Sequence, residues 1–140
     1  MDENRADACR RSLYLQQRRT QVATVLELFD APAMAITCSL RHTSTVPLQS
    51  LALMNSSFAR VRARAFAQRL LRNAEDDPSR VDWAFRIACG RPPRPEEVSA
   101  SGRFLTAHRR LYTQEKDAEL QTWTNFCQMI LASNAFLYVE

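Results

Sequence analysis

Two histidines, His42 and His108, are the side chains of this sequence best suited to proton transfer at neutral pH. A catalytic nucleophile would need such a base within reach, and no recognisable nucleophile motif lies beside either of them. His108 falls inside the apolar stripe of an expected helix, which makes it a candidate binding residue. The interpretation we favour for it is a histidine hydrogen-bonded at the edge of a core, and no catalytic residue is assigned.

Cysteine and histidine could also bind a metal. Cys38 and His42 are four residues apart and would share one face of a helix, but they fall in an expected loop, and two ligands do not make a zinc site. The four cysteines form neither a CxxC pair nor a CxxCH motif, which excludes covalent c-type haem on this chain. Cys89 and Cys127 are expected to be buried, and a disulfide between Cys9 and Cys38 stays open. We predict no metal and no cofactor.

Arginines form the most prominent charged group. Five of them occupy the side of an expected helix opposite Phe66 and Leu70, where they could bind phosphates or sulfated sugars. The alternative, which we favour, is a solvated face paired with acidic residues of neighbouring helices. The candidate binding residues here are Arg60, Arg64 and Arg72, accompanied by Arg62 and Arg69.

Composition limits the class of protein. The 140 residues carry a net charge of +4, from 19 basic residues against 15 acidic ones, which is mildly basic and makes nucleic acid the less favoured partner. No run approaches the roughly 18 apolar residues that a membrane span needs. Residues 1–11 are too polar for a signal peptide, and residues 1–9 are expected to be disordered. One domain over residues 1–140 fits this length.

The fold is expected to be all-α, a compact bundle of about five helices with an irregular or extended N-terminal segment. Only two glycines, no strongly alternating runs and several helix caps favour helices over a sheet. Residues 10–19 are predicted to be extended or irregular, and residues 22–29 to form a short helix.

The stretch over residues 45–72 should be the central element. Thr45 is placed as a cap and Pro47 in the first turn. The first half has an apolar face of Leu48, Leu51, Met54 and Phe58, and the second half has one of Ala59, Ala63, Phe66, Ala67 and Leu70. These faces differ by about 100° on a 3.6-residue period, so either the helix breaks near residues 55–57 or its halves pack on different neighbours.

Three further helices are expected. One begins at Asp77 and Pro78, or with a capping box of Ser79 and Asp82, and ends at Gly90 in the left-handed conformation. Its apolar faces are Val81, Ala84, Phe85 and Ala88 on one side and Trp83 and Ile87 on the other, which predicts a helix wedged between neighbours.

After a proline-rich connector, the next helix opens with Pro95, Glu96 and Glu97. Its predicted buried stripe is Val98, Phe104, Leu105, Leu111 and Tyr112, with Ser101 and His108 inside it. The last helix is predicted over residues 117–132, with Leu120, Trp123, Cys127, Ile130 and Leu131 on one face and Phe126 and Met129 elsewhere.

Four stretches, taken together and in this order, resemble a known family. They are RRSLYL at residues 10–15, TVPLQSLALMN at 45–55, AFRIACGRPPRPEE at 84–97 and LASNAFLYV at 131–139. The chain from about Arg10 onward is similar to the C-terminal part of the planctomycete-specific domain of unknown function. The family-motif residues are Thr45, Pro47, Gln49, Asn55 and Asn134.

The resemblance implies a large exported protein in which this domain follows cytochrome-c-like regions, and so an exported or periplasmic location. It implies no established activity. The family pattern has a glutamate where this chain has Ala135 and a cap-forming residue where Arg94 stands. If that glutamate is functional, this copy lacks it.

Our leading hypothesis is a non-catalytic helical interaction or structural module, whose partners are other domains of the parent protein or a separate protein. The first alternative is a module of an extracytoplasmic polysaccharide-acting enzyme that contacts anionic polysaccharide, and the second is an arginine-rich nucleic-acid-binding domain. A concave pocket joining His108 to a carboxylate and several arginines would favour the enzyme. A flat apolar patch near Leu53, Leu71 or Phe126 would favour docking.

Overall fold

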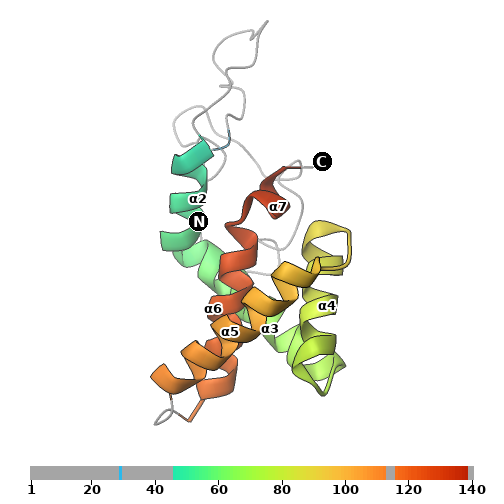
Figure 1. Ribbon diagram of the computed structural model, residues 1–140. Coiled ribbons are helices and arrows are strands. Elements are labelled where there is room, and N and C mark those ends of the chain that lie inside the picture. The colour runs from blue at the N-terminus through green and yellow to red at the C-terminus, as the bar shows by residue number, and fades with distance from the viewer. Residues whose placement is uncertain (1–28, 30–45, 113–115, 139–140) are drawn as a thin grey trace, which may run out of the picture. The chain divides into compact units, whose positions relative to one another are not determined.

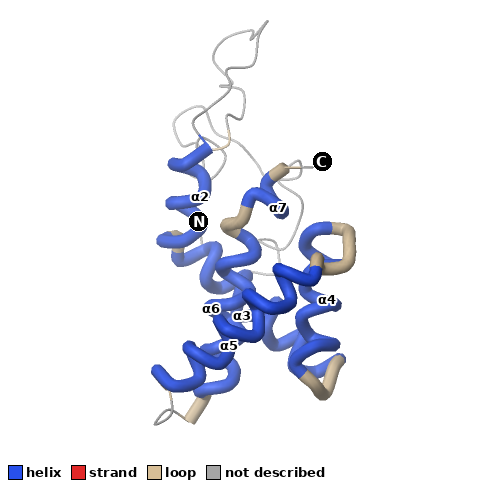
Figure 2. Tube along the Cα trace, in the orientation of Figure 1, coloured by secondary structure: helices blue, strands red, loops and turns tan. Residues whose placement is uncertain are grey.

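All regular secondary structure of the described residues is helical. The computed structural model describes residue 29, residues 46–112 and residues 116–138 (Figure 1). The helices are α2 (Val46–Asn55), α3 (Ser57–Asn73), α4 (Asp77–Cys89), α5 (Pro95–Leu111), α6 (Ala118–Leu131) and the short α7 (Asn134–Leu137) (Figure 2). The all-α prediction is confirmed. The predictions for residues 1–28, and those for Cys38, His42 and Thr45, lie outside the described residues.

The chain divides into two units between Gln49 and Ser50. The second unit, residues 50–140, contains the end of α2 and every later helix. The packing described below is internal to this unit. The single domain over residues 1–140 stays a prediction.

The predicted break in the central stretch is confirmed at Ser56, between α2 and α3. Ser56 has extended dihedral angles (φ −74°, ψ 131°), and its hydroxyl accepts from the backbone N–H of Ala59 as the N-cap of α3. The side-chain amide of Gln128 on α6 donates to the carbonyl oxygens of Leu53 and Met54, at 3.3 and 2.7 Å. These carbonyls at the end of α2 thus gain a partner from another helix.

The predicted apolar face of the first half is wrong for Leu51 and Met54, which are 55% and 58% exposed. The end of α2 is instead attached to α6 through polar contacts, because the hydroxyl of Ser50 donates to the carbonyl of Ala132 at 2.7 Å, next to the Gln128 contacts. Periodicity finds an apolar stripe but cannot reveal which side of the helix meets a neighbour.

The core forms where α3 lies against α6, the most extensive helix pair of the unit (Figure 1). The buried face of α3 is confirmed as Ala59, Ala63, Ala67 and Leu70, with Phe66 partly buried against it. Three alanines on that face let the backbone of α6 approach closely. The large side chains that fill the core therefore come mainly from α6, as Trp123, Phe126, Cys127 and Ile130, and from α4 and α5, as Val81, Phe85 and Leu105.

Helix α4 begins as predicted, but Asp76 is its N-cap, accepting from the N–H of Ser79 at 3.0 Å. Gly90 ends it with φ 69°, as expected. Nothing lies within 4 Å of a β-carbon built at Gly90, so its glycine requirement is conformational. The predicted wedge is wrong, because Trp83 and Ile87 are exposed among the described residues and only one side of α4 is buried.

Helix α5 buries less of its predicted stripe than expected. Ser101 and Leu105 are buried and Phe104 is partly buried, whereas Val98 and Leu111 are exposed. Its start is stabilised by Glu97, whose carboxylate accepts from the backbone N–H of Arg94 at 2.6 Å. Arg94 is the N-cap residue of α5 and its side chain has no oxygen to cap the helix. The bond to Glu97 therefore satisfies the backbone N–H of this residue.

Helix α6 is buried on more than one side. Thr122 and Thr124 are buried although polar, because each hydroxyl donates to the carbonyl four residues earlier, at 2.9 and 2.7 Å. Phe126 is fully buried and Leu71 is partly buried against the core, so neither offers the flat apolar patch that would have favoured docking. The described part of the chain also has no buried side-chain nitrogen or oxygen without a hydrogen-bond partner.

Candidate functional site

His108 lies half-buried between α5 and α6, stacked on an aromatic ring. Its ring is 4.0 Å from that of Phe104, with 19° between the planes. The Nδ1 atom of His108 is 3.5 Å from the side-chain nitrogen of Asn125, which also donates to the hydroxyl of Tyr112 at 2.9 Å. These contacts fix the orientation of the imidazole. They correspond to the interpretation favoured from sequence, a histidine hydrogen-bonded at the edge of a core.

The strongest charge cluster joins three helices at Arg109, near the end of α5. Its guanidinium donates twice to the carboxylate of Asp77 on α4, at 2.6 and 2.8 Å, and twice to that of Glu119 on α6, at 2.8 and 3.1 Å. Arg80 lies 3.4 Å from Glu119 and 3.6 Å from Asp77. Two forked contacts from one planar group fix three helix ends in register.

Trp123 connects this cluster to the core. Its indole N–H donates to Glu119 at 3.0 Å, and the guanidinium of Arg80 lies 5.7 Å from the centre of its ring. Hydrogen bonds from Arg109 lower the pKa of Asp77 and of Glu119, against a smaller opposing effect of burial. The same contacts raise the pKa of Arg109. Both carboxylates are thus held ionised and are poor proton donors at neutral pH.

A second forked pair follows α4. Arg91 donates to both carboxylate oxygens of Glu97 at 2.8 Å each, and its guanidinium lies over the ring of Phe85. These bonds lower the pKa of Glu97 to about 2. Sequence reasoning missed both clusters. In the sequence, Asp77 and Glu97 were assigned only to the starts of two expected helices.

The candidate arginines Arg60, Arg64 and Arg72 are all exposed on α3. Arg64 lies 3.7 Å from Asp117, and the Nε of Arg72 donates to the carbonyl of Gln68. Among the contacts of the described residues, none joins His108 to these three arginines. These contacts thus do not bring the four candidate binding residues together.

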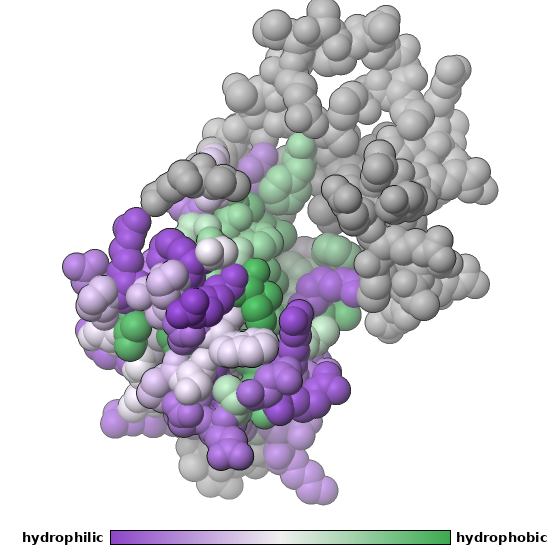
Figure 3. Space-filling model, turned by 90° about the vertical axis from the view of Figure 1, so that its right-hand side faces the viewer, coloured by the Kyte–Doolittle hydropathy of each residue, from purple (hydrophilic) through white to green (hydrophobic). Residues whose placement is uncertain are grey.

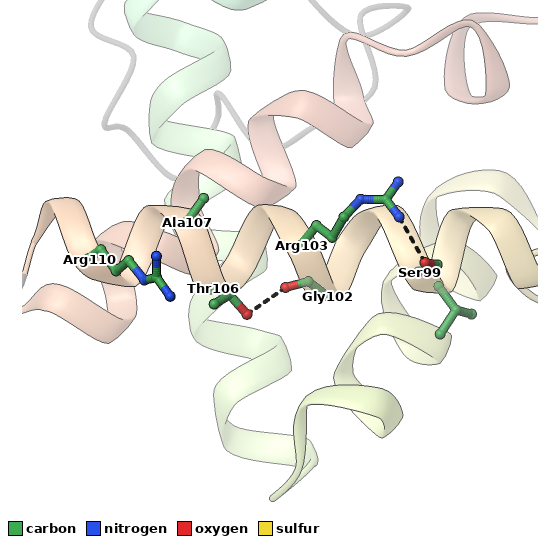
Figure 4. A pocket seen from close by; sticks show the side chains of 7 residues that line it. Ser99, Gly102, Arg103, Thr106, Ala107 and Arg110 are labelled. Atoms are coloured by element: carbon green, nitrogen blue, oxygen red, sulfur yellow. Dashed lines mark hydrogen bonds between the residues drawn. The ribbon is translucent and has the colours of Figure 1, made fainter.

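A shallow depression of about 430 Å³ runs along the outer side of α5 (Figure 4). Every residue lining it belongs to this one helix, and two internal hydrogen bonds, from Arg103 to Ser99 and from Thr106 to Gly102, cross it. Neither His108 nor a carboxylate is among its lining residues. It is the side of a helix, unlike the pocket at a junction of elements that we had associated with an enzyme.

The family-motif residues take structural positions where they are described. The side chain of Asn55 donates to the carbonyl of Leu51 near the end of α2, and Asn134 is the first residue of α7, accepting at its carbonyl from Tyr138. Pro47 and Gln49 lie within α2.

At the two cysteines that the structure describes, burial disfavours thiol chemistry. Cys127 is fully buried in the core, as predicted, and burial raises the pKa of its thiol. Cys89 is partly buried, and burial raises its thiol pKa too. Both thiols are therefore protonated and weakly nucleophilic at neutral pH.

Neither a cluster of metal ligands nor a membrane-spanning helix is found in the part of the chain that the structure describes. No group of three or more histidine, cysteine, aspartate or glutamate side chains there could hold a metal ion. No described helix combines the length and apolar character needed to cross a membrane.

Comparison with known proteins gives one finding. The family model described as PSD1, Protein of unknown function (DUF1553), matches residues 1–105. No curated protein and no solved structure matches the chain.

Proposed function

The chain belongs to the PSD1 family of proteins of unknown function, and from this premise we propose that it is a non-catalytic helical module that acts by packing against other domains of its parent protein. The family match spans three of the four stretches on which the sequence resemblance rests, and the stretch at 131–139 lies beyond it. That resemblance supports the finer proposal of an exported, planctomycete-type parent protein with cytochrome-c-like regions.

The observation that carries this proposal is the pair of ion pairs that Arg109 forms with Asp77 and Glu119. Asp77 and Glu119 are carboxylates on different helices that come together in space, the arrangement in which an acid and base pair could arise. Both are instead engaged by the same guanidinium and kept ionised. A group that must give up or take a proton at neutral pH needs a pKa near 7, and these contacts move both pKa values in the opposite direction.

The test mixes the purified chain with the separately expressed upstream region of its parent polypeptide. Size-exclusion chromatography with light scattering should show a one-to-one complex, and hydrogen exchange should locate the protected helices. Separate elution of the two proteins would contradict the proposal.

A parallel assay addresses the enzyme alternative. The chain and its His108→Ala variant are incubated with acidic and neutral polysaccharides, and reducing ends are measured. Our proposal expects no release by either protein. Release that the His108→Ala variant loses would refute a non-catalytic role.

A further inference from the structure

The positive charge of the chain is concentrated in α3. This helix carries five arginines and no acidic residue, and because the whole chain has a net charge of +4, everything outside α3 has a net charge of −1. The excess charge is therefore a property of one helix and not of the whole surface. A face of this kind attracts an acidic partner to one defined place.

The outer side of α3 has a centre and two edges. Val61, Ala65, Gln68 and Arg72 are spaced by four, three and four residues, which places them in one row on a helix, opposite the buried alanines. Arg60 and Arg64 flank this row on one side and Arg69 on the other. The first two residues of the row, Val61 and Ala65, are apolar, and the side chain of Val61 is 40% exposed. From Arg60 to Arg72 the face is about 18 Å long at 1.5 Å per residue.

The internal contacts of these arginines leave their charge at the surface. The pair of Arg64 and Asp117 has 3.7 Å between its closest atoms, and the two side chains are 48% and 69% exposed. Pairs this exposed are weak, so a partner carboxylate can replace Asp117 at little cost. The bond from Arg72 goes to a backbone carbonyl and does not neutralise the guanidinium.

We propose that this face, the row of Val61, Ala65, Gln68 and Arg72 with flanking Arg60, Arg64 and Arg69, docks an acidic helical segment of a protein partner. Guanidinium groups bind carboxylates in forked pairs along both edges, and small apolar side chains pack against Val61 and Ala65 in the centre. The inference rests on the proposed function, because it names the surface and the chemistry of the partner for an interaction module.

The apolar centre is what favours a protein over other polyanions. Duplex DNA and acidic polysaccharide would contact the arginines but gain nothing from an exposed Val61 and Ala65 between them. Protein interfaces, in contrast, combine arginine with an apolar centre and a charged partner rim. Figure 3 shows hydrophobic side chains among hydrophilic ones on another face as well, but among the described helices α3 carries the largest excess of positive charge.

The test measures binding of the full chain to a synthetic helical peptide with an alanine and leucine row flanked by glutamates. Fluorescence anisotropy of the labelled peptide gives the affinity. The Arg60→Gln/Arg64→Gln variant should bind about tenfold more weakly, since two flanking charges are lost. The control variant is Arg86→Gln/Arg103→Gln, on α4 and α5. It has the same net charge as the Arg60→Gln/Arg64→Gln variant but should bind the peptide as tightly as the unmodified chain does.

Two further arms separate an acidic helix from other polyanions. Val61→Asn should weaken peptide binding severalfold and leave any binding to duplex DNA or polygalacturonate unchanged. Raising salt from about 0.1 to about 1 M should weaken peptide binding, because the Debye length falls from about 10 to about 3 Å.

The inference is overturned if both double variants lose affinity equally, if Val61→Asn has no effect on the peptide, or if duplex DNA or polygalacturonate binds more tightly than the peptide does. A complex with the upstream parent region that survives the Arg60→Gln/Arg64→Gln change would leave the proposed module intact and remove α3 as its docking face.

Discussion

Replacing Arg109 with methionine removes the group that connects α4, α5 and α6 while keeping an unbranched apolar side chain of similar reach. Four hydrogen bonds to Asp77 and Glu119 are lost. The side chains of Arg109, Asp77 and Glu119 are 37%, 35% and 44% exposed, so values for partly screened pairs apply and those for buried pairs do not.

Two forked pairs at roughly 0.3–1 kcal/mol each, together with the repulsion left between two carboxylates, give an expected loss of about 1–2 kcal/mol in the free energy of unfolding. For a unit of this size that corresponds to a fall in Tm of about 6–12 °C. Urea unfolding followed by circular dichroism and by tryptophan fluorescence measures it, and both signals should move together because Trp123 contacts the cluster.

The matched control is Arg103→Met, on the same helix but on its outer side, where the guanidinium contacts only Ser99 among the bonds described. Its cost should be about 0.5 kcal/mol or less. A double-mutant cycle of Arg109→Met with Asp77→Asn should give a coupling energy of about 1 kcal/mol. Additive losses, or a loss for Arg109→Met no larger than that of the control, would show that the cluster does not hold the helices together.

Three further outcomes are expected. The pKa of Glu97 is lowered to about 2 by Arg91, so the stability it contributes is complete above its unfolded pKa of about 4.3 and is lost as pH falls toward 2; Tm measured over this range should fall less steeply in Arg91→Met. Gly90→Ala should cost about 1 kcal/mol in urea unfolding, because φ is 69° and nothing crowds the added methyl, whereas Gly102→Ala, within α5, should stabilise. Gln128→Ala should increase hydrogen exchange at the end of α2 and leave exchange in α5 unchanged. If the end of α2 is equally protected in both proteins, the Gln128 amide has no role in stabilising it.

Local sequence rules were sufficient for the helices themselves. The break at Ser56, the start of α5 at Pro95 and the left-handed end of α4 at Gly90 all depend on side chains within a few residues of the site. The buried face of α3 was also predicted, because four residues at helical spacing with small or apolar side chains leave one face that can be buried.

Which neighbour each helix face contacts was decided only by the tertiary structure. Leu51 and Met54 fit an apolar stripe as well as the α3 alanines do, yet α2 contacts α6 through Ser50 and Gln128. Asp77 satisfied the rules for a cap, but Asp76 takes that role and Asp77 pairs with Arg109, 32 residues away.

The sequence by itself determined the break at Ser56, the start of α5 and the end of α4, because capping and period act within a turn of the chain. It also placed the five arginines on one helix. The partners of Arg109, the burial of Phe126 and the exposure of Val61 depend on which helices meet, and that depends on packing between residues ten or more positions apart. Periodicity carries no information about a pair such as Arg109 and Asp77, so the Arg109 cluster could be read only from the assembled fold.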